Sequence, residues 1–103
     1  MKEIWYEEFA PDRGYQKLQE ALFETPYSFQ KEIASYLRKG NVILTGLSRA
    51  KDVFTGERIP DEVHIMTDGE YLWPNELAWY VEKYNLRLPK DFEEHILKKL
   101  EIH

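Results

Sequence analysis

The chain has 103 residues, 43% of them hydrophobic and 15% aromatic, so it can bury one ring-rich core and is too apolar for a disordered segment. Cysteine is absent, which excludes disulfides and thiolate metal sites, and the net charge of -5 favours basic partners and disfavours nucleic acid. Because no stretch resembles a signal peptide, a membrane span or a linker, we expect a single cytoplasmic domain over residues 1–103 with no membrane partner.

Two helices are predicted before residue 41. Tyr15, Leu18 and Leu22 share one side at helical spacing, which predicts a short helix over Gly14–Glu24 with Asp12 as its N-cap. A second amphipathic helix follows, and it ends at Gly40. Thr25 before Pro26, or Ser28, can cap its start, and its apolar stripe consists of Phe29, Ile33, Tyr36 and Leu37.

The segment Asn41–Leu47 is apolar on both faces, with Val42 and Leu44 on one and Ile43 on the other. This pattern is typical of a strand covered on both sides, so we predict that Asn41–Leu47 is the central strand of a sheet. The following segment, Ser48–Asp61, is predicted as a brief strand or loop that ends in a turn.

A β-hairpin is predicted around Asp68-Gly69, which lies between the β-prone runs Glu62–Thr67 and Glu70–Trp73. Asp-Gly tolerates the positive φ angles of a two-residue type I′ turn. This turn pairs Thr67 with Glu70, Met66 with Tyr71, Ile65 with Leu72 and His64 with Trp73.

The two faces of this hairpin differ in composition. One face is aliphatic and contains Val63, Ile65 and Leu72, whereas the other contains His64, Met66, Tyr71 and Trp73. We expect the aliphatic face to pack under the helices. The aromatic face is then either covered by other segments or presented to a partner.

Two further helices complete the chain. Asn75 can cap a helix to Tyr84, on which Trp79 lies opposite an apolar side formed by Leu77, Tyr80, Val81 and Tyr84. An extended connection, Leu86–Pro89, leads to a last helix with Phe92, Ile96, Leu97 and Leu100 on one side. The predicted fold is α+β, with two N-terminal helices, a small antiparallel sheet centred on the hairpin, and two C-terminal helices.

The residues predict no catalytic centre. The three histidines match no zinc spacing; His64 is expected to pack against Trp73, and His95 to pair with Asp91 on the surface. Ser48 lacks the glycine that a nucleophile elbow requires. The hairpin carboxylates, Asp61, Glu62, Asp68 and Glu70, can share a proton or a metal, but they are more simply a solvated rim, so we expect no enzyme activity and no cofactor.

Aromatic residues beside carboxylates are the usual composition of a protein-binding surface. We therefore predict a partner-binding surface for a basic protein, formed by Asp61, Glu62, Glu70, Tyr71, Trp73 and Trp79. The alternative for these rings is a place in the core, and it is open for each of them except Trp79.

The runs Thr67–Pro74 (TDGEYLWP), Leu77–Tyr84 (LAWYVEKY) and Leu88–Phe92 (LPKDF) resemble small bacterial immunity proteins of polymorphic toxin systems, including contact-dependent growth inhibition. The similarity covers about the C-terminal half and supplies no functional residue. The resemblance implies an immunity protein, not an enzyme, that covers the active site of a cationic toxin, often a nuclease. We expect a monomer or weak dimer when the toxin is absent.

Two other functions are open. A small metal-dependent hydrolase would use the hairpin carboxylates with His64, and a bound divalent ion or a deep polar pocket would favour it. A homo-oligomeric adaptor protein would bury the aromatic face of the hairpin against a second copy.

Overall fold

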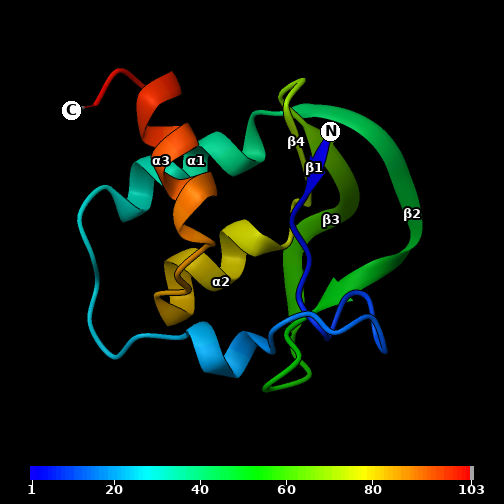
Figure 1. Ribbon diagram of the computed structural model, residues 1–103. Coiled ribbons are helices and arrows are strands. Elements are labelled where there is room, and N and C mark those ends of the chain that lie inside the picture. Colours follow the sequence, from blue (N-terminus) through cyan, green and yellow to red (C-terminus); the bar gives the residue numbers. More distant parts are fainter. Residues whose placement is uncertain (103) are drawn as a thin grey trace.

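A mixed sheet in the order β1-β4-β3-β2 carries the helices on one side (Figure 1). The computed structural model describes residues 1–102, without the side chains of Leu47, Ser48 and Glu62. β1 runs parallel to β4, whereas β3 is antiparallel to both β4 and β2. The elements are β1 (Lys2–Glu3), the 3-10 turn η1 (Leu18–Ala21), α1 (Gln30–Arg38), β2 (Asn41–Lys51), β3 (Arg58–Thr67), β4 (Tyr71–Pro74), α2 (Leu77–Tyr84) and α3 (Lys90–Lys99). The α+β class is confirmed.

The first predicted helix is wrong. Gly14–Glu24 contains the turn η1 and an isolated bridge from Leu22 to Leu86 in place of an α-helix, and Asp12 has a left-handed φ of 63° instead of an N-cap conformation. Leu18 and Ala21 are three residues apart and buried, so a 3-10 turn suffices to place both in the core. The predicted second helix is therefore the first α-helix of the described chain, and it begins at Gln30, after Phe29 in a left-handed conformation.

β2 is an edge strand, so the prediction of a central strand is wrong. Val42, Ile43 and Leu44 are 52%, 51% and 63% exposed. Uninterrupted apolar residues are also compatible with an uncovered edge, and the pattern alone does not separate the two cases. β2 continues to Lys51 and forms a second hairpin with β3, where the sequence predicted only a brief strand or loop.

The β3–β4 hairpin forms with a register two residues from the predicted one. Thr67 pairs with Leu72 and Met66 with Trp73, because the turn is centred on Gly69-Glu70 and not on Asp68-Gly69. Gly69 has a φ of 97°, which glycine adopts without strain. A shift of two residues keeps every side chain on its predicted face.

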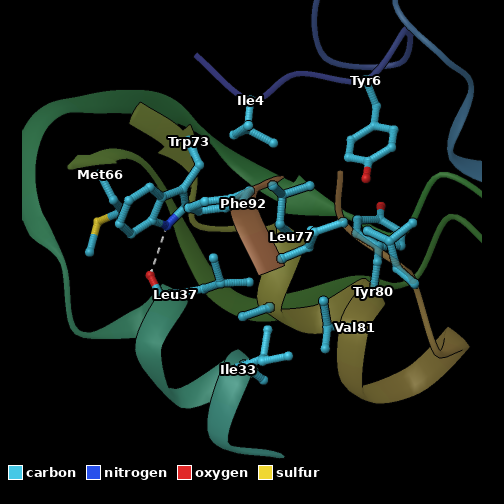
Figure 2. Packing of buried hydrophobic residues seen from close by; sticks show 14 of the residues in the cluster. Ile4, Tyr6, Ile33, Leu37, Met66, Trp73, Leu77, Tyr80, Val81 and Phe92 are labelled. Atoms are coloured by element: carbon cyan, nitrogen blue, oxygen red, sulfur yellow. Dashed lines mark hydrogen bonds between the residues drawn. The ribbon is translucent and has the colours of Figure 1, made fainter. Parts of the chain in front are cut away.

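The helices cover the aromatic face of the hairpin, and not the aliphatic face as predicted. Trp73 is fully buried, and its Nε1 donates a hydrogen bond to the Leu37 carbonyl at 3.0 Å (Figure 2). Tyr71 stacks on Phe92 of α3 with ring centroids 4.7 Å apart. Rings bury more area than aliphatic side chains, so this face gives the larger hydrophobic gain under the helices.

α2 and α3 agree with the predicted helices. Most of the predicted apolar positions are buried, including Leu77, Tyr80, Val81, Phe92 and Ile96, whereas Leu100 lies beyond the end of α3 and is 36% exposed. Asn75, however, does not cap α2. Its Oδ1 accepts the backbone N–H of His64 at 2.9 Å, so the side chain ties the start of α2 to β3.

Candidate functional site

The six predicted binding residues do not form one surface. Tyr71 and Trp73 are 6% and 0% exposed, and buried side chains cannot contact a partner, so their assignment as anchors is wrong. Glu62 lies outside the described side chains. Glu70 lies at the β3–β4 turn, whereas Asp61 and Trp79 lie toward the other end of β3.

At the β3–β4 turn, Asp68 ties the hairpin to α1 and α3. Its Oδ1 accepts the backbone N–H groups of Glu70 and Tyr71, and its Oδ2 accepts the Tyr36 hydroxyl at 2.5 Å. Nε2 of His95 lies 2.6 Å from the same oxygen. The predicted pairing of His95 with Asp91 is therefore wrong; its partner is Asp68.

This environment keeps Asp68 ionised. Burial acts to raise its pKa, but the Tyr36 hydroxyl, the two turn N–H groups and His95 hold the pKa of Asp68 well below its ordinary value. These contacts close the turn and hold it to α1 and α3. The arrangement is that of a structural carboxylate, and Glu70 beside it pairs with Lys99 at 2.8 Å.

The predicted carboxylate cluster is divided between the two ends of β3. Asp61 pairs with Arg38 of α1 at 3.1 Å, and Arg38 also contacts Glu82 of α2. No group of three or more metal-ligating side chains occurs among residues 1–102 as far as their side chains are described. In the strand register Trp73 pairs with Met66, so it is not opposite His64 as predicted; His64 lies opposite Asn75, and its Nδ1 lies 3.1 Å from the Thr45 hydroxyl.

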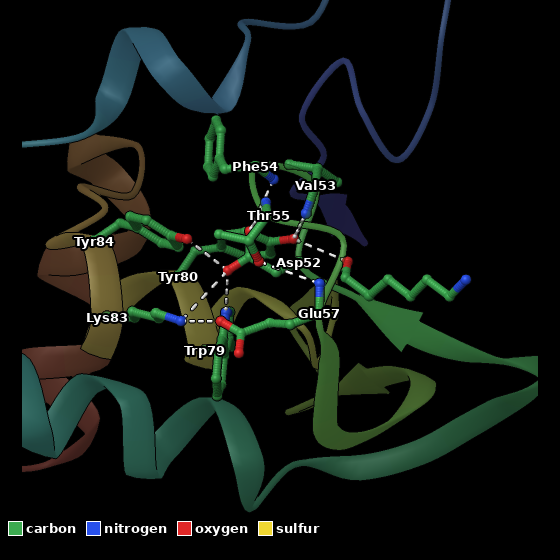
Figure 3. A network of polar contacts seen from close by, with 10 residues as sticks. Asp52, Val53, Phe54, Thr55, Glu57, Trp79, Tyr80, Lys83 and Tyr84 are labelled. Carbon is green, nitrogen blue, oxygen red and sulfur yellow. Dashed lines mark hydrogen bonds and ion pairs between the residues drawn. The ribbon is translucent and has the colours of Figure 1, made fainter.

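A buried carboxylate, Asp52, organises the β2–β3 turn and the outer side of α2 (Figure 3). Asp52 is 1% exposed. Its Oδ1 accepts the N–H groups of Phe54 and Thr55, which closes the turn. Its Oδ2 accepts the indole N–H of Trp79 at 3.0 Å and the hydroxyl of Tyr84 at 2.6 Å.

Hydrogen bonds to both carboxylate oxygens compensate the burial of the Asp52 charge. Burial alone would raise its pKa, but the hydrogen bonds from Tyr84, Trp79 and the turn hold the pKa of Asp52 below its ordinary value. Lys83 Nζ lies 3.9 Å from Oδ2 and 4.7 Å above the Trp79 ring, and it also pairs with Glu57. The indole of Trp79 is thus fixed at its edge by Asp52 and covered by Lys83.

Four further carboxylates are linked to the region of Trp79, two of them on α2 and two through ion pairs. Glu57 pairs with Lys83, whose ammonium lies above the Trp79 ring, and Arg38 pairs with both Asp61 and Glu82. Glu76 precedes Trp79 by one helical turn; burial, and then the negative charge of Asp61, raise the pKa of Glu76. We call this region the Trp79 surface; it consists of Glu57, Asp61, Glu76, Trp79 and Glu82 with the cations Arg38 and Lys83.

The predicted binding residues Asp61 and Trp79 lie in the Trp79 surface, whereas Asp52 was not among the predicted residues. A signal was present: Asp52 is followed four residues later by Gly56, which has a φ of 76°. Aspartate with a following glycine predicts a turn in the same way as Asp68-Gly69. In both turns the aspartate binds backbone N–H groups with one oxygen and aromatic donors with the other.

The fold and site define a small α+β domain with an acidic, tryptophan-centred surface. Comparison with protein-family models, with curated proteins and with solved structures gives no match. The resemblance to immunity proteins therefore stays a prediction. None of the described helices is both long and apolar enough to cross a membrane.

Proposed function

We propose that the chain is an immunity-type protein that captures a basic protein toxin, such as a nuclease, and covers its active site with the Trp79 surface. The observation that carries this proposal is the Trp79 indole, a half-buried ring held by the buried Asp52, with Glu76 and Glu82 about one helical turn away on either side of it along α2. Tryptophan is enriched among the residues that contribute most to binding energy at protein interfaces.

Rigidity supports the proposed role of this ring. The indole N–H is bonded to Asp52, and the Lys83 ammonium lies above the ring. A side chain that is already ordered loses little entropy when a partner binds, so more of its contact energy appears as affinity. The surrounding charges then accelerate association with a cationic protein.

The carboxylate pair of Asp61 and Glu76 supports a cationic partner. Asp61 has Arg38 as its cation, whereas Glu76 makes no ion pair with another described residue and feels the negative charge of Asp61. An arginine or lysine of a partner placed between them would offset this repulsion. Neutralising phosphate-binding cations in a nuclease would also remove its affinity for nucleic acid.

If the gene next to the one for this chain encodes a secreted toxin, its isolated toxic domain is the partner in the test; a neighbouring gene of another kind counts against the proposal. We expect Glu76→Lys to weaken the complex and to lose protection of cells that express the toxin. Glu94→Lys, which makes the same charge change at an exposed position of α3, should retain both binding and protection. Raising the salt concentration should slow association of the unmodified chain.

The proposal is wrong if Glu76→Lys and Glu94→Lys bind and protect equally, or if the toxin does not bind the unmodified chain. Circular dichroism of both variants establishes that the charge changes leave the fold intact. If both variants are folded and bind and protect equally, the Trp79 surface has a structural role and is not the binding site.

A further inference from the structure

The outer edge of β2 differs in chemistry from the rest of the molecule. Residues 41–48 contain no charged side chain, in a chain with 32% charged residues. β2 is the last strand of the sheet order, so no other strand among the described residues pairs with its outer side. Unpaired backbone groups on such an edge are a template for another strand.

The start of β2 combines this open edge with exposed apolar side chains. Val42, Ile43 and Leu44 are each more than half exposed. Leu44 pairs with Ile65 and so extends the aliphatic face of the sheet toward the edge. One extra residue lies between the pairs formed by Val42 and Leu44, which is a bulge at Ile43 and increases the local twist.

Cations bracket this apolar segment at both ends. Lys39 precedes it, and Arg49 and Lys51 follow it, all of them exposed. Lys51 lies directly opposite Arg58 of β3, a like-charge pair that an incoming anion would relieve. Lys39, Lys51 and Arg58 make no ion pair with another described residue, whereas Arg49 lies opposite Glu62 of β3 in the strand register.

We propose that the β2 edge, residues 39–51, binds an extended peptide segment whose apolar centre is flanked by acidic residues. Such a segment adds a fifth strand, its apolar side chains cover Val42 to Leu44, and its carboxylates pair with Lys39, Arg49 and Lys51. Because both ends of the edge are basic, a parallel and an antiparallel segment satisfy the same charge pattern. This edge is distinct from the Trp79 surface, and the proposal does not depend on it.

The charge pattern disfavours a second copy as the occupant. In an antiparallel β2–β2 pair centred on Leu44, Lys39 of one copy lies opposite Arg49 of the other. A pair centred on Thr45 places Lys39 opposite Lys51. Like charges directly opposite destabilise a strand pair, whereas acidic ends remove this repulsion.

The test uses two synthetic nine-residue peptides with the centre Val-Thr-Ile-Thr-Val, one with two aspartates at each end and one with two lysines. We expect the full chain to bind the aspartate-ended peptide at least about tenfold more tightly at low salt. Binding should slow amide exchange in residues 41–45. Arg49→Glu combined with Lys51→Glu should reverse the preference, whereas Lys98→Glu on α3 should not.

Four results overturn the proposal. The first is that neither peptide binds, and the second is equal affinity for both, which assigns the edge no charge selectivity. The third is a concentration-dependent dimer in sedimentation that protects residues 41–45 without peptide, which identifies a second copy as the occupant. Slowed exchange on α2 in place of β2 would also contradict it.

Discussion

Replacing Asp52 by asparagine tests the organisation of the candidate site. The substitution keeps the shape but replaces one oxygen with an N–H₂ group. Two donors face each carboxylate oxygen: Phe54 and Thr55 on Oδ1, and Trp79 and Tyr84 on Oδ2. Either orientation of the amide therefore sets a donor against donors. The Tyr84 hydroxyl can rotate and accept, whereas an indole or backbone N–H cannot.

The expected loss follows from these contacts. A hydrogen bond to a charged group contributes about 1.5–3 kcal/mol, and a buried donor without an acceptor costs about 1–3 kcal/mol. We expect Asp52→Asn to lower the free energy of unfolding by about 3 kcal/mol. In a domain of this size that lowers the melting temperature by roughly 12 to 24 °C.

Urea unfolding followed by circular dichroism measures this change. Asp12→Asn is the matched control, because Asp12 is exposed and has a left-handed φ that asparagine tolerates. A loss for Asp52→Asn no larger than that of the control would refute the description of Asp52 as a buried, fully paired carboxylate. Trp79 fluorescence should also change in Asp52→Asn.

Three other predictions follow from the structure. The pKa of Asp68 is lowered in the folded state, so its stabilisation is present above the unfolded pKa of about 4 and is lost at lower pH; Asp68→Asn should flatten the acid limb of a urea-midpoint profile. Burial is the main cause that raises the pKa of Tyr80 and Tyr84 to about 12, so the free energy of unfolding should fall as pH rises from about 10 to about 12. Tyrosinate absorbance of these two residues should then appear at a higher pH in the folded than in the unfolded protein. A pKa of about 10 for both in the native protein would contradict this. Gly40→Ala sets a methyl group 2.8 Å from Cζ2 of Trp73 and should cost about 1–3 kcal/mol with a changed near-ultraviolet spectrum; an unchanged unfolding midpoint would show that the indole can move.

Helical periodicity predicted α2 and α3, because each pairs one apolar side with a polar side and the core covers that apolar side. It failed at Gly14–Glu24, where the spacing of Leu18 and Ala21 also fits a 3-10 turn. For β2, local sequence does not say which strand ends a sheet, since that depends on where β1 and β4 pair.

Helical periodicity also made part of the candidate site predictable. The helical angle of Trp79 placed it away from the apolar side of α2, and the structure leaves it half-buried there. Its hydrogen bond to Asp52 joins residues 27 positions apart, which no local pattern reveals. The sequence prediction placed Asp61 and Glu70 in one acidic rim around the hairpin. Because a strand rises about 3.3 Å per residue, the length of β3 between Asp61 and the turn keeps the two residues apart.

The dissociation rate of the toxin complex tests the central claim most directly. Trp79→Ala should cost about 2 kcal/mol or more, an increase of about 30-fold in the dissociation constant that appears mainly as faster dissociation. Trp5→Ala is the matched control, because Trp5 is also half-buried and donates its indole N–H to a carboxylate, that of Glu3 at 2.9 Å. We predict fast dissociation for Trp79→Ala alone. Equal dissociation rates for the two variants and the unmodified chain would contradict the assignment of the Trp79 surface as the binding site.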